Sequence, residues 1–102
     1  MNHISHLPGH ELVEKGQADL QAGVKSLESL LLEIGRPRFE RLGIHLPRLL
    51  EADESPELAL YEMLAEHYEN EAHSRYNALL RRLVSYQRCL EASYKIFLIA
   101  SP

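Results

Sequence analysis

The sequence has only one cysteine, Cys89, so no disulfide can form within the chain. A chain without disulfides suits a reducing compartment. The amino end lacks the basic stretch and apolar run of a secretory signal. The longest uninterrupted apolar run covers only residues 96–100, whereas a membrane-spanning helix needs about 20 apolar residues. We therefore expect a cytoplasmic protein that does not cross a membrane.

Glycine and proline are few, and they are concentrated in the first half of the chain. All five glycines lie at or before Gly43, and after Pro56 the only proline is Pro102. These two residue types are the strongest breaks of regular structure. We therefore expect short helices in the first half and long helix in the second half.

The motifs of common enzyme classes are also absent from the sequence. There is no glycine-rich phosphate loop, no GxSxG nucleophile motif and no HExxH zinc motif. Cys89 has no suitably placed group to stabilise a thiolate, so we interpret it as a small core residue. A net charge of -4 argues weakly against nucleic acid as the main partner. These absences favour a binding protein without a cofactor over an enzyme.

What the chain does contain is enough apolar sequence for one hydrophobic core. Of its 102 residues, 45% are apolar and 25% are charged, which is typical of a soluble globular protein. This length corresponds to one domain, and we predict a single all-α domain over residues 1–102. Within it, we expect residues 1–8 to be a flexible amino-terminal segment and residues 95–102 to be a tail.

Helix signals divide the first half into several short elements. The first helix is predicted over about Gly9–Ala22, because the next glycine would stop it. Ser26 can cap a second helix that ends at Gly35. A short helix over Pro37–Leu42 and a single turn over Pro47–Leu50 would follow. The helix between Ser26 and Gly35 has the clearest amphipathic pattern, which is formed by Leu27, Leu30, Leu31 and Ile34.

The second half starts with a strong helix signal at Ser55 and Pro56. From Tyr61 to Phe97, apolar residues recur every 3.6 residues on average, which is the period of an α-helix. One continuous helix would be about 60 Å long, far longer than a compact chain of this size is wide. We expect a break within Glu66–Glu71, and a single long helix is the alternative. The predicted fold is a small bundle of four or five helices with a long C-terminal helix or helical hairpin.

Charge is strongly segregated in this second half. Residues 51–74 contain eight acids and no lysine or arginine, whereas residues 75–95 contain five bases and one acid, Glu91. Opposite charges on neighbouring helices attract, although an exposed pair contributes only about 0–1 kcal/mol. We therefore expect the acidic segment to lie beside the basic segment, in the same chain or in a second copy.

A row of tyrosines and leucines along the last helix is the candidate protein–protein interface. Tyrosine is enriched in such interfaces, and the apolar residues 96–99 continue the row. A homodimer is the commonest way to bury such a surface, and the alternative is that the amino-terminal helices cover it within one chain. The leading hypothesis is a small interaction module, an adaptor or regulator, acting as a homodimer. The candidate residues are Tyr76, Leu79, Leu83, Tyr86, Leu90, Tyr94 and Phe97.

Two rival functions rest on polar residues. A stripe of carboxylates and one histidine at helical spacing could hold a metal ion in a small helical enzyme or metal-binding protein. The stripe lies about 120° around the helix from the apolar row, so we expect it to face water and to hold no metal. Two arginine clusters, Arg36–Arg48 and Arg75–Arg88, would suit a nucleic-acid-binding regulator if they formed one patch. The candidate metal ligands are Glu62, Glu66, Glu69 and His73, and a looser set is His3, His6 and His10.

Overall fold

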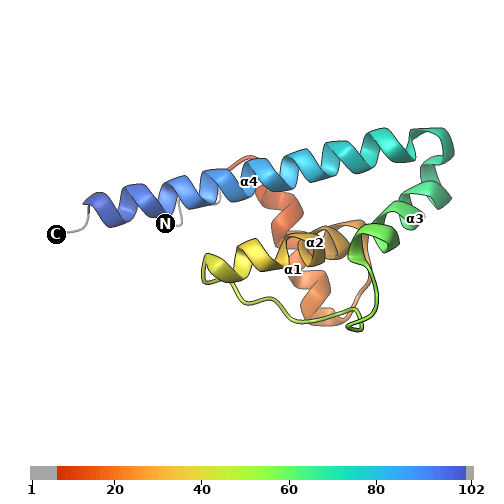
Figure 1. Cartoon of the computed structure of the whole chain (residues 1–102), viewed down its shortest axis with the longest axis horizontal. Coiled ribbons are helices and arrows are strands. Elements are labelled where there is room, and N and C mark those ends of the chain that lie inside the picture. Colours follow the sequence, from red (N-terminus) through yellow and green to blue (C-terminus); the bar gives the residue numbers. More distant parts are fainter. Residues whose placement is uncertain (1–6, 101–102) are drawn as a thin grey trace.

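In the computed structural model, the backbone is described for residues 7–100 and the side chains for residues 7–94. This part of the chain consists of helices and their connections, without a strand (Figure 1). The all-α fold class is therefore confirmed. The elements are α1 (His10–Ala22), α2 (Leu27–Arg41), α3 (Pro56–Tyr68), the 3₁₀ turn η2 (Glu69–Glu71) and α4 (Ala72–Ala100).

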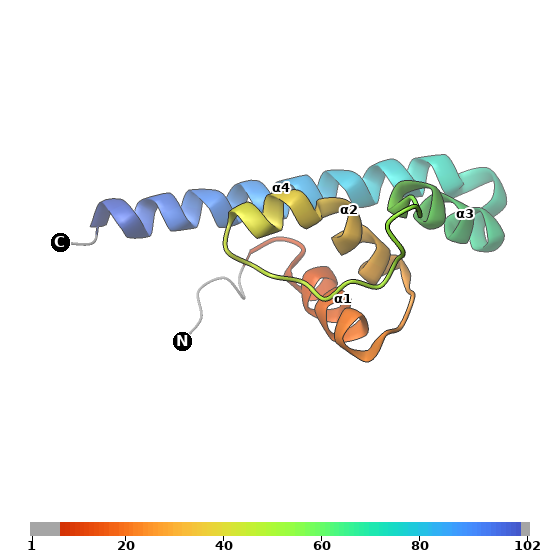
Figure 2. The same cartoon turned by 60° about the horizontal axis from the view of Figure 1, so that its bottom comes forward.

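Helix α4 forms a straight bar along the longest dimension of the molecule. The chain measures 51 × 26 × 22 Å, and the 29 residues of α4 correspond to a helix of about 43 Å. Helices α1 and α2 pack beneath its middle, and α3 folds back from its amino-terminal end (Figure 1). The carboxyl-terminal turns of α4 extend past the other helices in both views (Figure 2). The fold is therefore a small bundle with one projecting helix.

The connection between α1 and α2 follows the predicted signals. Gly23 has a φ of 71° and ends α1 in the left-handed conformation. The Ser26 hydroxyl accepts a hydrogen bond from the backbone N–H of Ser29, and a reciprocal bond completes a capping box. Ser26 also donates to the Asp19 carboxylate at 2.6 Å. This hydrogen bond joins the end of α1 to the cap of α2. The hydrogen bond from Lys15, and to a smaller extent that from Ser26, lowers the pKa of Asp19.

Helix α2 does not end at Gly35, so the predicted helix end there is wrong. The helix continues through Pro37 to Arg41 because its second half is held by tertiary packing. A Cβ atom on Gly35 would lie 2.8 Å from the side-chain nitrogen of Gln87, so glycine permits α2 to cross α4 closely. Phe39 is fully buried after the crossing. This packing outweighs the cost of an internal proline, about 3 kcal/mol.

The predicted count of four or five helices in the bundle is not matched, because two of the expected short elements do not form separate helices. The short helix over Pro37–Leu42 is the second half of α2, and Pro47–Leu50 lies in a non-helical connection. Glycine and proline usually break a helix. At Gly35 and Pro37, however, tertiary packing keeps the backbone helical.

A buried ion pair holds the connection between α2 and α3 against α2. The Arg36 guanidinium pairs with the Glu33 carboxylate and donates to the backbone oxygens of Leu46 at 2.5 Å and Pro47 at 2.7 Å. The other carboxylate oxygen of Glu33 accepts from the N–H of Leu50 at 3.2 Å. Glu33 and Arg36 are only 8% and 7% exposed. We call this arrangement the Glu33–Arg36 clamp.

The break in the second half lies where the polar sequence predicts it. Helix α3 ends at Tyr68, η2 reverses the chain, and α4 begins at Ala72, which is buried. Ser55 caps α3 by accepting from the N–H of Leu58 at 3.2 Å. The result is a helical hairpin, so the single continuous helix is excluded. The hairpin is closed by the rings of Tyr61 and Tyr76, which meet edge to face with centroids 5.7 Å apart.

Replacing Gly16 with alanine should destabilise the protein. A Cβ atom at Gly16 would lie 2.7 Å from Leu32 side-chain carbons and 2.8 Å from the Glu28 carbonyl oxygen. We expect Gly16→Ala to lower the free energy of unfolding in urea by about 1–3 kcal/mol through overpacking. This is opposite in sign to the gain of about 1 kcal/mol that alanine brings in an open helix. Ala18→Gly, at an exposed site on α1, measures that intrinsic preference, and a more stable Gly16→Ala protein would contradict the close crossing.

Removing one partner of the Glu33–Arg36 clamp should be costly. Arg36→Met leaves the Glu33 carboxylate buried without its charge partner and leaves two carbonyl oxygens without donors, so we expect a loss of about 3–5 kcal/mol in unfolding free energy. Arg41→Met, at an exposed position of the same helix, is the matched control and should change stability by less than about 0.5 kcal/mol. The double variant Glu33→Leu/Arg36→Met should recover part of the loss. Equal effects of Arg36→Met and Arg41→Met would rule out the clamp.

Candidate interaction surface

The predicted tyrosine–leucine row lies mainly on the inner side of α4. Leu83, Tyr86 and Leu90 are at most 4% exposed and belong to the core. The Tyr86 ring lies 6.3 Å from that of Phe39 on α2. Burial, and then the neighbouring Tyr94, raises the pKa of Tyr86. These three side chains therefore pack within the chain, as the alternative hypothesis allowed.

The remaining members of the row are more accessible. Tyr76, Leu79 and Tyr94 are partly buried and pack against the core. Burial, and then the charge of Glu57, raises the pKa of Tyr76. Phe97 and the rest of the apolar tail lie outside the residues whose side chains are described. A contact with another molecule through these positions stays a prediction.

The structure does not gather the candidate metal ligands. The four residues of the stripe are exposed, and α3 ends at Tyr68 before the stripe is complete. His73 lies on α4, where its ring interacts with the Asn77 amide at 3.2 Å. His10 lies beside Glu14, and His3 and His6 fall outside the described residues. Within residues 7–94, no three histidine, cysteine or carboxylate side chains are placed to hold a metal ion.

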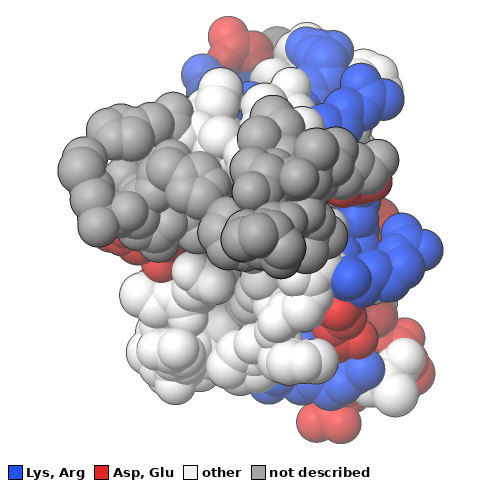
Figure 3. All heavy atoms as spheres, turned by 90° about the vertical axis from the view of Figure 1, so that its left-hand side faces the viewer, with Lys and Arg blue, Asp and Glu red and all other residues white. Residues whose placement is uncertain are grey.

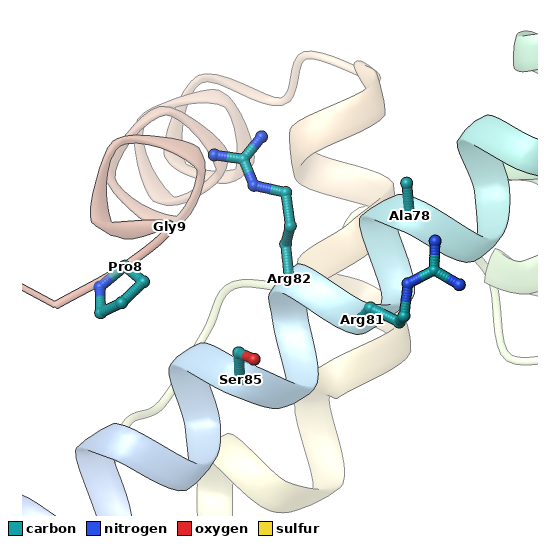
Figure 4. A pocket seen from close by; sticks show the side chains of 6 residues that line it. All are labelled: Pro8, Gly9, Ala78, Arg81, Arg82 and Ser85. Atoms are coloured by element: carbon teal, nitrogen blue, oxygen red, sulfur yellow. The ribbon is translucent and has the colours of Figure 1, made fainter.

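The outer side of α4 presents a surface formed by the second arginine cluster, whose residues are not among the interface candidates predicted from the sequence. Arg81 and Arg88 are exposed, and at 100° per residue they lie opposite the buried Leu83 and Leu90. A hollow of about 330 Å³ opens between this side of α4 and the start of α1, lined by Pro8, Gly9, Ala78, Arg81, Arg82 and Ser85. Figure 4 shows Arg82 reaching toward α1, whereas Arg81 points away from it.

Two further hollows adjoin this one. One shares Arg81 and Ser85 with it and adds Leu80, Val84 and Arg88. The other shares Ala78 and Arg82 and includes Arg75. Together they form a continuous strip along α4 from Arg75 to Arg88, about 20 Å long at 1.5 Å per residue. We call this strip the arginine furrow. On α4 it is lined by four arginines, Arg75, Arg81, Arg82 and Arg88, and by small and aliphatic side chains, Ala78, Leu79, Leu80, Val84 and Ser85. The other segments contribute Pro8, Gly9, Leu27, Leu64 and Tyr68 to its lining.

The furrow is positively charged, and part of its charge has no ionic partner among the residues whose side chains are described. None of the side chains that line it, among those described, is acidic. Arg75 pairs with Glu71 at 3.1 Å, and Arg82 pairs with Glu11 at 2.9 Å. Arg81 and Arg88 form no ion pair with any residue between 7 and 94. These two arginines are therefore available to an acidic partner.

The acidic segment lies beside the basic helix, but the two segments make little ionic contact. Helices α3 and α4 are neighbours in the hairpin, and Glu71–Arg75 is the ion pair that joins the two segments in the described structure. Arg82 pairs instead with Glu11 on α1. Glu62 and Glu66 are exposed on α3. The sequence therefore predicted that the segments adjoin, but apolar packing rather than charge joins them.

The two arginine clusters do not form one patch. Arg36 is buried in the clamp, and Arg38 pairs with Glu91 at 2.8 Å. Arg38 and Glu91 line a separate hollow that shares no residue with the furrow. Viewed along α4 from its carboxyl-terminal end, basic and acidic side chains alternate on one side of the molecule (Figure 3). This arrangement does not meet the condition that a nucleic-acid-binding patch required.

The sequence contains a signal for the furrow that a search for hydrophobic periodicity does not register. Arg81 and Arg88 are seven residues apart, as are Arg75 and Arg82, and such pairs fall on the same side of a helix. Small residues lie between them at Ala78 and Ser85. This pattern is visible only when the polar side of the helix is examined for its own spacing.

Comparisons with known proteins add no relationship. No protein-family model matches the chain, and neither the curated proteins nor the solved structures contain a significant match. Across the described residues, none of the helices combines the length and the apolar character needed to cross a membrane.

Reversing the charge of two adjacent arginines should affect stability differently. Arg82→Glu places a second acid beside Glu11, so we expect a loss of up to about 1 kcal/mol in unfolding free energy at low salt. Arg81→Glu should change it by less than about 0.5 kcal/mol, because Arg81 has no ionic partner in the described structure. Urea unfolding at two salt concentrations measures both effects. An equal loss of unfolding free energy in both variants would show that the Glu11–Arg82 ion pair does not stabilise the protein.

Proposed function

We propose that this protein is a small protein–protein interaction module, an adaptor or regulator, that binds its partner through the arginine furrow. The observation that supports this function is the furrow itself, which combines four arginines with small and aliphatic side chains along α4. Arginine is enriched in protein interfaces and among the residues that dominate their binding energy. An amphipathic helix with acidic edges has the complementary chemistry.

The shape of the furrow favours a helix as the bound element. The furrow is about 20 Å long, which matches about 13 residues of α-helix at 1.5 Å per residue. Ala78 and Ser85 have short side chains, so a bound helix could approach α4 closely. Val84 lines the furrow together with Arg81 and Arg88 and is 36% exposed. It would lose water on binding, which supplies a nonpolar contribution that simple ion pairs lack.

Charge also favours a protein partner over nucleic acid. Two of the four arginines are already paired with Glu71 and Glu11, so few cations are free to contact phosphates. Binding to nucleic acid depends mainly on the number of phosphates that basic side chains neutralise. The net charge of the chain is -4, which would further weaken such binding.

The projecting end of α4 supports the same function. The last buried residue of α4 in the described part is Leu90, and the helical backbone continues to Ala100, about 15 Å further. The sequence of these last turns includes the apolar run 96–99. A partner bound along the furrow would meet this projecting helix next.

Photo-crosslinking in intact cells tests the proposed function. A photoreactive phenylalanine in place of Val84 lies in the furrow beside Arg81 and Arg88, and the same residue in place of Gln21 marks an exposed position on α1. We expect a discrete protein adduct from position 84 and none from position 21. The double variant Arg81→Glu/Arg88→Glu should reduce the adduct by roughly tenfold, since two exposed ion pairs together contribute up to about 2 kcal/mol and about 1.4 kcal/mol corresponds to tenfold.

Several outcomes of this experiment would contradict the proposal. Equal labelling from positions 84 and 21 would show that the furrow is not a specific surface. An adduct that survives the double charge reversal would show that the arginines do not bind the partner. Circular dichroism of each purified variant confirms that the substitutions, all at exposed positions, leave the helices intact.

A further inference from the structure

The outer side of α3 is an acidic amphipathic surface without an ionic partner among the described residues. Leu60 and Leu64 are buried on its inner side, whereas Leu58 is 58% exposed. At 100° per residue, Glu62 points opposite to these buried leucines, with Leu58 and Glu66 beside it. Glu62 and Glu66 form no ion pair with any described residue. We call Leu58, Glu62 and Glu66 the acidic face of α3.

The acidic face of α3 and the arginine furrow are complementary in charge and in length. The furrow offers two unpaired guanidinium groups, Arg81 and Arg88, beside the exposed Val84. The acidic face offers two unpaired carboxylates beside the exposed Leu58. Helix α3 has 13 residues, about 20 Å at 1.5 Å per residue, which equals the length of the furrow. The guanidinium groups of the furrow could therefore pair with the carboxylates of the acidic face.

These two surfaces cannot meet within one chain. Helix α3 packs on the core through Leu60 and Leu64, which turns Glu62 and Glu66 away from that core. Arg81 and Arg88 likewise lie on the side of α4 opposite its buried leucines. In one copy of the chain, the hairpin therefore holds both unpaired surfaces outward. A second copy brings them together without any change in the fold.

We infer that the arginine furrow of one copy binds the acidic face of α3 from a second copy. The self-contact combines ion pairs at the edges with burial of Leu58 against Val84 and Leu80. It rests on the proposed function, because it names the partner of the same furrow. Association of this kind weakens as salt screens the charges.

Charge exchange between two variants of the full chain tests the inference. The furrow variant is Arg81→Glu/Arg88→Glu, and the α3 variant is Glu62→Arg/Glu66→Arg. Each variant alone brings like charges together, so we expect its self-association constant to fall at least about tenfold. An equimolar mixture restores opposite charges at both kinds of contact, so it should associate like the wild type. Sedimentation equilibrium at low and high salt measures all four samples.

A matched control separates this effect from a general change in charge. Arg48→Glu and Glu51→Arg reverse exposed charges in the connection between α2 and α3, away from both surfaces. Each control should associate like the wild type. Mass spectrometry of the adduct from position 84 gives a second reading, because the inference expects a peptide containing residues 56–68 of the same chain.

The outcomes distinguish the inference from the proposed function. A wild type that is monomeric at the highest attainable concentration overturns the inference, and so does a mixture that associates no better than its separate variants. If position 84 then crosslinks to a different protein, the proposed function stands and only the identity of the partner is wrong. If position 84 forms no adduct and the wild type is monomeric, both are overturned.

Discussion

The structure depends on the burial of one ion pair, the Glu33–Arg36 clamp. Burying two charges carries a large desolvation cost, and this cost is offset only when further hydrogen bonds satisfy both groups. Here those bonds come from the backbone of the connection between α2 and α3, at Leu46, Pro47 and Leu50. Glu33 and Arg36 therefore need the backbone of this connection as a hydrogen-bonding partner. The same hydrogen bonds hold the connection against α2. The clamp thereby holds the connection that leads to α3, whose first turn is capped by Ser55.

Helix α2 carries the clamp and also determines the position of the other helices. It contacts α1, α3 and α4, and glycine allows two of these contacts to be close: Gly16 of α1 against α2, and Gly35 of α2 against α4. Gln87 adds a hydrogen bond to the Gly35 carbonyl oxygen at 3.0 Å. This bond and the burial of Leu83 and Leu90 place the same side of α4 against the core. Once Gln87 and Leu83 face α2, Arg81 and Arg88 must face solvent.

The proposed function follows from this orientation of α4. The apolar row of α4 is largely used inside the chain, where Leu83, Tyr86 and Leu90 form part of the core. The surfaces proposed for a partner are the arginine furrow and the acidic face of α3 on the same hairpin. In the described part of the chain, both combine charges that lack an ionic partner with an exposed apolar side chain, Val84 or Leu58. Specificity in such contacts comes from the arrangement of charge more than from the area buried.

Local sequence signals determined the all-α class, the starts of α2 and α3 at Ser26 and Ser55, and the break between α3 and α4, because caps and polar breaks act on neighbouring residues. The tertiary structure alone decided that α2 continues past Gly35 and Pro37. Gln87 of α4 donates a hydrogen bond to the Gly35 carbonyl oxygen, and Phe39 is buried in the core. The tertiary structure also decided that Leu83, Tyr86 and Leu90 of the tyrosine–leucine row pack inward on the same chain. The spacing of apolar residues identifies which side of a helix is buried. It does not say whether that side packs on the same chain or on another, since both remove the same surface from water.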